Sequence, residues 1–242
     1  MNRWKKGIVA LLFLLLLRFA IGPSPVDAGS LEEMFIRQRE EMVKEQIEKR
    51  GVKNPRVLAA LQAVPRHRFV PELLHDIAYS DGPLPIGEGQ TISQPYIVAF
   101  MTELADIQPG EKVLEVGTGS GYQAAVLAEL TSEVYTIEIL PGLAARAKAN
   151  LESTGYAQVK TRVGDGYLGW PEAAPFDAIL VTAAADHVPQ PLIDQLAERG
   201  VLVIPVGKAG GLQELQRLRK RKGKMTTEKI LPVVFVPLKH ES

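Results

Sequence analysis

The sequence predicts an α/β protein with a mostly parallel sheet, helices on both faces of the sheet and an antiparallel C-terminal end. Beyond Pro109-Gly110, short apolar segments alternate with segments of helical character, which is typical of parallel strands connected by helices. A glycine-rich loop directly follows the first of these apolar segments. The last two apolar segments flank a turn at Lys222-Gly223-Lys224, so we expect them to pair as an antiparallel hairpin.

The composition is that of one large globular domain. The chain has 242 residues, of which 46% are apolar and 23% are charged, and this length is short for two domains. The absence of cysteine excludes disulfides, a thiol nucleophile and a cysteine-ligated zinc site. The formal net charge is zero, so the overall charge gives no reason to expect nucleic acid as a partner.

The first 28 residues differ in composition from the rest. Basic residues precede an apolar run at 7–17, and Val26-Asp27-Ala28 resembles a cleavage site with small residues. This layout is typical of a secretory signal peptide, and the run is too short for a standard membrane span. A membrane anchor through residues 7–22 and a true start at Met34 remain alternatives.

Residues 30–105 are expected to form a helical cap. Ser30 is suited to cap a helix that ends at Gly51, and Pro55 is placed to start a second, short helix. The stretch 80–94 is rich in glycine and proline but contains enough apolar residues to form an ordered loop. We expect Ser93 to cap the helix that follows, with Pro95 in its first turn.

Residues 106–242 are expected to form the α/β core, which makes a single domain with the cap over residues 30–242. Strands are predicted at 112–116, 133–139, 158–163, 176–182, 200–205, 212–220 and 226–238. Helices are predicted at 121–130, 141–153 and 189–198. Six basic residues between Arg217 and Lys224 then lie on the C-terminal hairpin. We interpret them as a charged edge that discourages strand addition rather than as a nucleic-acid patch.

The loop after the first core strand reads Glu115-Val-Gly117-Thr-Gly119-Ser-Gly121. Its glycines are spaced G-x-G-x-G, whereas the dinucleotide fingerprint is G-x-G-x-x-G and holds a pyrophosphate. Glycines let a bulky, uncharged ligand lie directly on the turn, and the carboxylate of Glu115 suits a cationic ammonium group. A tight turn without a ligand is the alternative.

Two further acids follow the second and third core strands. Glu138 is placed to accept hydrogen bonds from both hydroxyls of a ribose, with a solvated strand-end charge as the alternative. Asp165, between Gly164 and Gly166, is placed to contact an adenine amino group, with an Asx turn as the alternative. Because each acid lies at or beyond the carboxyl end of a parallel strand, we expect the three to lie near one another. Ligands of open α/β sheets bind at this edge of the sheet. An ammonium group, a ribose and an adenine without phosphates describe S-adenosyl-L-methionine.

Several segments together resemble the protein-L-isoaspartate O-methyltransferases, namely residues 65–71, 84–87, 90–95, 113–123 and 164–166. The resemblance covers roughly residues 34–238, and the Gln-Thr-Ile-Ser-Gln-Pro segment at 90–95 is its specific part. It implies a Rossmann-like, S-adenosylmethionine-dependent methyltransferase fold. It also implies methyl esterification of the free α-carboxylate of L-isoaspartyl residues in damaged proteins and peptides, which initiates their repair. Residues 1–30 have no counterpart in the usual bacterial enzyme.

The resemblance assigns roles to individual residues. Ser93 matches the family's active-site residue and is the predicted catalytic residue, with a helix cap as the alternative role. The predicted cofactor-binding residues are Gln90, Thr91, Glu115, Gly117, Gly119, Gly121, Glu138, Asp165 and Gly166. No metal is expected, because the histidines and carboxylates do not cluster at ligand spacing.

The expected partners are isoaspartyl-containing proteins and peptides, and we expect a monomer that does not bind nucleic acid. Because S-adenosyl-L-methionine is made in the cytoplasm, a cytoplasmic location is expected. Export to the periplasm and membrane anchoring through residues 1–28 remain alternatives. Two other functions stay open: a methyltransferase for another carboxylate acceptor, and a non-catalytic module that binds S-adenosylmethionine. The intact segment around Ser93 favours the isoaspartyl enzyme.

Overall fold

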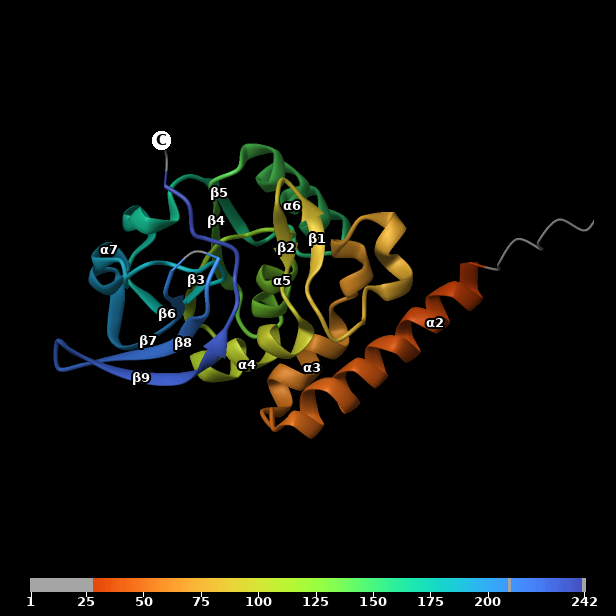
Figure 1. The fold of residues 1–242 in the computed structure, drawn as a ribbon, viewed down its shortest axis with the longest axis horizontal. Helices are drawn as coiled ribbons and strands as arrows, with labels where there is room; N and C mark the ends of the chain where they lie inside the picture. The colour runs from red at the N-terminus through yellow and green to blue at the C-terminus, as the bar shows by residue number, and fades with distance from the viewer. Residues whose placement is uncertain (1–27, 209, 241–242) are drawn as a thin grey trace, which may run out of the picture. The chain divides into compact units, whose positions relative to one another are not determined.

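The computed structural model describes residues 28–208 and 210–240 (Figure 1). The chain divides into two compact parts, residues 1–37 and 38–242, and the described residues of the first part are helical. The predicted signal or anchor segment lies outside the described residues, apart from Ala28. Among the described residues, no helix is both long enough and apolar enough to cross a bilayer. The single domain over residues 30–242 stays a prediction.

A seven-stranded sheet forms the core of residues 38–242. Its strands are β3 (Lys112–Val116), β4 (Glu133–Glu138), β5 (Lys160–Val163), β6 (Phe176–Val181), β7 (Leu196–Val206), β8 (Gln213–Arg221) and β9 (Lys224–Val233). Their order in the sheet is β5-β4-β3-β6-β7-β8-β9. The pairs from β5 to β7 are parallel, and β7–β8 and β8–β9 are antiparallel. The predicted fold class is confirmed.

Helices connect the parallel strands and pack against them (Figure 1). α5 (Tyr122–Ala128) joins β3 to β4 and contacts both, and α6 (Pro141–Ser153) joins β4 to β5 and contacts both. α4 (Pro95–Ala105) precedes the sheet in sequence and contacts β6 and β7. The last four residues of β6 are all buried, as expected for a parallel strand that is covered on both faces.

The segment before the sheet is helical, as expected, but its first helix changes type along its length. The helices here are α2 (Ala28–Glu41), the π-helical turn η1 (Met42–Ile47), the 3-10 turn η2 (Glu48–Arg50), α3 (Pro55–Ala63), and the 3-10 turns η3 (Arg66–Phe69) and η4 (Glu72–Ile77). Gly51 ends η2 with a φ of 102°, which confirms the predicted end of the first helix. The side chain of Asn54 caps α3 by accepting a hydrogen bond from the backbone N–H of Arg56.

The stretch 80–94, expected to be an ordered loop, contains a small antiparallel hairpin. Its strands are β1 (Leu84–Gly87) and β2 (Gln90–Ile92), and the buried residues Leu84 and Ile92 pair across it. The tip of the hairpin is attached to α6, because Nη2 of Arg146 lies 2.9 Å from Oε1 of Glu88. The segment before Ser93 lies at the carboxyl end of the sheet, close to the ends of β3 and β4.

Three predicted helix boundaries are wrong. Ser30 is not the N-cap of the first helix, because α2 already includes Ala28. The helix predicted at 189–198 is α7 (Gln190–Asp194), and it is shorter because β7 already begins at Leu196, which pairs with Phe176 of β6. Ser93 is not the N-cap of α4, because Gln94 occupies that position without a capping side-chain hydrogen bond and Pro95 starts the helix. The structure therefore removes the helix-cap alternative for Ser93.

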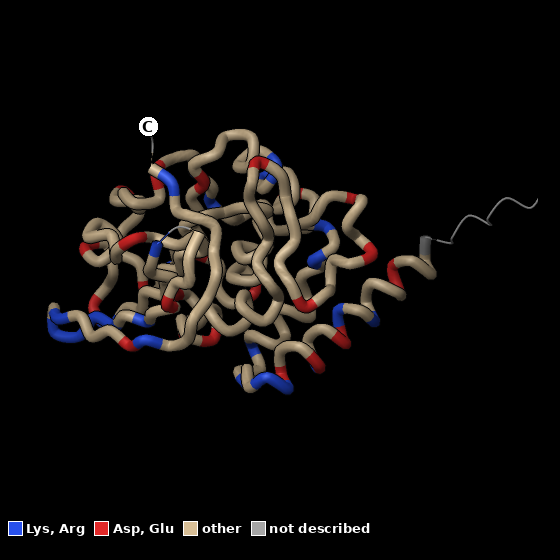
Figure 2. Tube along the Cα trace, viewed as in Figure 1, with Lys and Arg blue, Asp and Glu red and all other residues tan. Residues whose placement is uncertain are grey.

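Only β9 forms the edge of the sheet, and most basic residues of the β8–β9 hairpin lie on β8, which pairs with β7 and with β9. The expected charged edge is therefore wrong for those residues, although several basic residues gather near the tip (Figure 2). Two cross-strand ion pairs involve this hairpin, Arg217 with Glu228 and Lys229 with Glu214. The ammonium group of Lys220 instead donates hydrogen bonds to two backbone carbonyls near the start of β7. Some of the basic side chains of this hairpin are thus paired with carboxylates or backbone carbonyls of the same protein.

Candidate functional site

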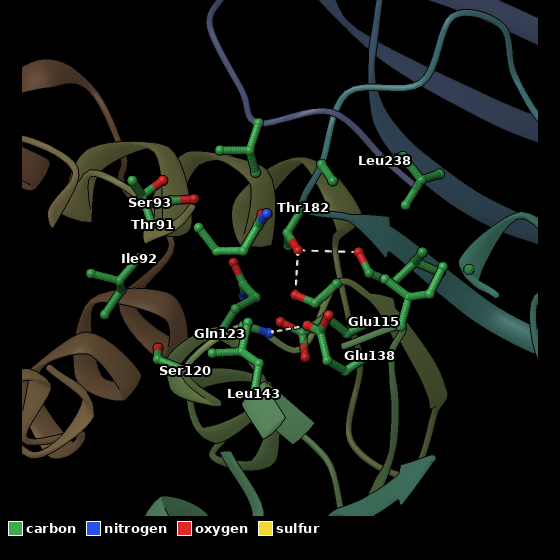
Figure 3. A pocket seen from close by; sticks show the side chains of 18 of the residues that line it. Thr91, Ile92, Ser93, Glu115, Ser120, Gln123, Glu138, Leu143, Thr182 and Leu238 are labelled. Carbon is green, nitrogen blue, oxygen red and sulfur yellow. Dashed lines mark hydrogen bonds between the residues drawn. The ribbon is translucent and has the colours of Figure 1, made fainter. Parts of the chain in front are cut away.

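A cavity opens beyond the carboxyl ends of β3 and β4 (Figure 3). One side of it is formed by β2 and the residues that follow it, which contribute Thr91 and Ser93. The other side is formed by the ends of the two strands, which contribute Glu115 and Glu138. The segment after β9 closes it further with residues 236–239. Residues from both halves of the predicted site therefore share one space.

The glycine loop between β3 and α5 requires the backbone geometry that glycine allows. The backbone N–H of Gly117 donates to the carbonyl of Ile137 at 2.8 Å, with φ at +101°. A Cβ at this position would lie 2.6 Å from Oγ1 of Thr182, whose hydroxyl donates to the carbonyl of Gly117. Gly119 also lines the cavity, and it bears no side chain that would fill it. The loop thus presents the backbone of Gly117 and Gly119 to the cavity, together with Ser120.

Gly121 has a structural role instead. It does not line the cavity, and it adopts a φ of +90° at the start of α5. A Cβ there would approach Leu151 and the carbonyl of Ala147 at 3.1 and 3.2 Å, so the glycine permits α6 to lie close to the loop. Its predicted contact with the cofactor stays a prediction.

Glu138 holds the glycine loop in place. One carboxylate oxygen accepts a hydrogen bond from the backbone N–H of Gly119 at 2.8 Å, and the other accepts one from Leu140 at 3.1 Å. The side chain is only 6% exposed, which argues against a solvated strand-end charge. Each oxygen retains a further acceptor position, so the carboxylate can also bind hydroxyl groups of a ligand in the cavity.

Glu115 is a completely buried carboxyl group beside the cavity. Its Oε2 accepts a hydrogen bond from the hydroxyl of Thr136 at 2.6 Å, and Thr136 in turn accepts one from Thr118. Its Oε1 has no hydrogen-bond partner among the described residues. Burial raises the pKa of Glu115 from 4.5 to about 8, a shift that the Thr136 hydroxyl opposes and the Glu138 carboxylate increases. A cationic ligand group would satisfy Oε1 and favour the charged form.

Asp165 makes the Asx turn that was the alternative for it. Its Oδ1 accepts a hydrogen bond from the backbone N–H of Tyr167 at 2.8 Å, and its Oδ2 lies 3.2 Å from Nδ1 of His240. Asp165 is not among the residues that line the cavity, whereas Gly166 is. A Cβ on Gly166 would lie 2.4 Å from Cγ1 of Val116, so no larger residue fits there. The adenine contact of Asp165 stays a prediction.

Ser93 faces two adjoining cavities. It lines the cavity described above and a second one, which is bordered by α4 and the segment that follows β9. Gln90 and Thr91 line the first cavity as well. The carbonyl of Ser93 accepts a hydrogen bond from the guanidinium of Arg66 at 2.7 Å, which fixes the backbone of this segment. The structure thus places the predicted catalytic residue beside the predicted cofactor residues.

Most residues that line the cavity were not among the predicted site residues, and two polar ones, Thr182 and Gln123, illustrate why. Thr182 follows β6, and its hydroxyl binds the carbonyls of Val116 and Gly117 at 3.1 and 2.6 Å. A polar residue at the carboxyl end of a core strand was the available signal. Gln123 of α5 also lines the cavity, and it has no comparable signal in the sequence. The described residues contain no cluster of three or more histidine, aspartate or glutamate side chains suited to a metal.

Comparison with known proteins identifies the family. The family model for protein-L-isoaspartate(D-aspartate) O-methyltransferase matches residues 37–242. The protein-L-isoaspartate O-methyltransferase of Picosynechococcus sp. is 59% identical over 204 residues, which are 84% of this chain and 91% of that protein. The protein of the same name from Opitutus terrae is 57% identical over 213 residues, with 88% and 91% covered.

A solved structure agrees with these sequence matches. A protein-L-isoaspartate O-methyltransferase from Plasmodium falciparum, in complex with S-adenosyl-L-homocysteine, superposes with a TM-score of 0.74 and 27% identity. The match covers 84% of this chain and 99% of that protein. These findings confirm the family and the enzyme class that the sequence predicts. The chain belongs to the protein-L-isoaspartate(D-aspartate) O-methyltransferase family.

Proposed function

We propose that this chain transfers a methyl group from S-adenosyl-L-methionine to the free α-carboxylate of L-isoaspartyl residues in damaged proteins and peptides. The observation that carries the proposal is the shared cavity. Glu115 and Glu138 of the core and Ser93 of the segment specific to the family line the same space. A transfer between two substrates needs both binding surfaces to meet at one point.

The described residues fit the proposed cofactor in charge and in shape. Oε1 of Glu115 is a buried acceptor without a partner among them, which suits an ammonium group. The spare acceptor positions of Glu138 suit ribose hydroxyls, and Gly117 and Gly119 line the cavity beside it. When bound, S-adenosyl-L-methionine supplies a methyl group that is already activated on a sulfonium. Asp165 and Gly166 remain our candidates for the adenine side.

The reaction requires little acid–base chemistry from the protein. An α-carboxylate has an ordinary pKa of about 3.5 and is ionised at neutral pH without a general base. The buried histidine of η3, His67, is unsuited to that role, because burial lowers its pKa to about 4. The protein must mainly remove water and align the acceptor. We assign this alignment to Ser93, whose hydroxyl can donate a hydrogen bond to the acceptor carboxylate, and Gln90 and Thr91 beside it remain our candidates for binding the cofactor.

We extend the proposal to partners and location. The zero net charge and the internal pairing of Arg217 and Lys229 support a protein without a nucleic-acid partner. A monomer that needs no metal remains our expectation. The cytoplasmic supply of the cofactor supports a cytoplasmic enzyme, and periplasmic or anchored forms through residues 1–28 are the alternatives. N-terminal sequencing of the native protein from separated cell fractions decides between them.

A peptide methylation assay tests the proposed function. The substrate is an isoaspartyl peptide, and the matched control is the same peptide with a normal aspartyl linkage. We expect the isoaspartyl peptide alone to gain a base-labile methyl ester, with one S-adenosylhomocysteine formed per ester. Methylation of small carboxylic acids but not of the peptide would show another acceptor. Binding of S-adenosylhomocysteine without any turnover would show a non-catalytic module, and either result contradicts the proposal.

A further inference from the structure

Arg66 is a charged residue that the fold buries completely. It begins the 3-10 turn η3, within the segment 65–71, and its exposure is 0%. Its Nε donates to the carbonyl of Ala78 at 2.8 Å, and its Nη2 donates to the carbonyl of Ser93 at 2.7 Å. Among the described residues, its Nη1 has no hydrogen-bond partner and no carboxylate bonds to the guanidinium. The charge is therefore buried without an opposite charge in contact.

Such a residue is costly for folding. A buried ion loses its hydration, and replacing buried ionic groups by apolar ones of similar volume is often neutral or stabilising. Burial lowers the pKa of Arg66 to about 10, which still leaves the guanidinium charged at neutral pH. The hydrogen bonds to the carbonyls of Ala78 and Ser93 offset part of the cost of burying the charge. A buried charge without an opposite charge is expected mainly at functional sites, where a role in binding or catalysis offsets the loss of stability.

Arg66 contacts two residues of the cavity wall, Ser93 and Tyr122. Ser93 lines the cavity, and so does Tyr122 of α5, whose ring centroid lies 4.9 Å from the guanidinium carbon. Phe69, from the same 3-10 turn, meets the ring of Tyr122 edge-on at 5.6 Å. The turn η3 therefore contacts two residues of the cavity wall. Arg66 donates a hydrogen bond to Ser93, and Arg66 and Phe69 both pack against the ring of Tyr122. Arg66 itself does not line the cavity.

We propose that Arg66 is a positioning residue for methyl transfer, which fixes the carbonyl of Ser93 and the ring of Tyr122 and so holds the wall against which the acceptor carboxylate is aligned. The inference rests on the proposed function and adds a residue to it. A planar guanidinium can donate to two carbonyls and cover an aromatic ring at the same time, and neither methionine nor lysine can do all three.

The test compares two arginines of the same chemistry. Arg56 also bridges two backbone carbonyls, those of Ile107 and Leu130 at 2.8 Å each, but it is absent from both cavities that Ser93 lines. We expect Arg66→Met to lower the single-turnover rate with isoaspartyl peptide by about 10-fold or more, since misalignment raises the barrier directly. Arg56→Met should leave that rate unchanged. Rates are normalised to the sites that bind S-adenosylhomocysteine, counted by calorimetry, so that unfolded protein does not contribute.

Stability supplies the second measurement. We expect the melting temperature of Arg66→Met to fall no further than that of Arg56→Met, and Arg66→Lys to recover part of the rate. A normal single-turnover rate in Arg66→Met overturns the proposal. If Arg66→Met does not fold, Arg66→Lys decides: we expect at least about a 3-fold loss of rate per binding site, and a normal rate overturns the proposal. Wild-type enzyme that fails to methylate the peptide would instead contradict the proposed function itself.

Discussion

Replacing Glu115 with glutamine should stabilise the ligand-free protein, and the effect should depend on pH. Burial raises the pKa of Glu115 to about 8, whereas in the unfolded chain it is near 4.5. Below pH 4.5 the carboxyl group is protonated in both states and causes no penalty. Between pH 4.5 and 8 only the unfolded chain gains from ionisation, so the free energy of unfolding falls as the pH rises and levels off above pH 8.

The interval between these two pKa values sets the size of the effect. From 4.5 to about 8 it corresponds to at most about 5 kcal/mol. Local relaxation and water entry reduce such penalties, so we expect Glu115→Gln to raise the free energy of unfolding by about 1–3 kcal/mol at pH 8. The neutral amide keeps an oxygen that can accept the Thr136 hydroxyl bond, so that contact does not obscure the gain.

Urea unfolding at pH 6, 7 and 8 measures this directly. The wild-type free energy of unfolding should fall over this range relative to that of Glu115→Gln. Calorimetry with S-adenosylhomocysteine should show wild-type affinity rising with pH and a proton released on binding, detected by comparing buffers of different ionisation enthalpy. Glu115→Gln should release no proton and bind about 10-fold or more weakly, as expected for a lost charge-assisted hydrogen bond. Identical pH dependence of unfolding in the two proteins would refute the reasoning.

Three further predictions concern the same cavity. Because Gln94 occupies the N-cap of α4, Ser93→Ala should leave the melting temperature nearly unchanged and lower the single-turnover rate about 10- to 100-fold; full activity would show that the hydroxyl does not align the acceptor. Glu138→Gln should weaken S-adenosylhomocysteine binding by about 1.5–3 kcal/mol in calorimetry, and unchanged affinity in the folded variant would contradict the ribose assignment. At saturating cofactor and peptide, the rate should be flat from pH 6 to 8, because His67 has a pKa of about 4; a midpoint near pH 7 would reveal a base that the structure does not suggest.

The sequence predicts the core better than its borders. The apolar runs of β3 and β6 and the acids that follow the strands depend on local pattern, so their positions agree with the structure. The end of α7 depends on a contact that local pattern does not contain, the pairing of Leu196 with Phe176. The sequence does not predict the hairpin at 84–92, because the glycine and proline residues in that stretch are typical of loops.

The sequence also predicts only some of the residues of the site. Glu115, Glu138 and Ser93 carry recognisable spacing or motif, and the structure brings them into one cavity. The capping role expected of Ser93 is wrong, because the helix starts one residue later than a serine–proline pattern suggests. Arg66 could not be singled out from its sequence, since an arginine in a basic segment is usually exposed. Its importance follows from burial and from a hydrogen bond across 27 positions of the chain.

The two walls of the cavity are encoded in separate stretches of the chain. Residues 90–98 contribute the wall that carries Ser93, and residues 115–123 and 137–143 contribute the strand-end surface with the acids and glycines. Sequence diversity can therefore be confined to the first stretch while the second is left intact. A gene library restricted to codons 83–94 would alter the surface offered to an incoming acceptor and preserve the glycine loop. The fold thus offers protein engineers a starting point for methylating other carboxylates.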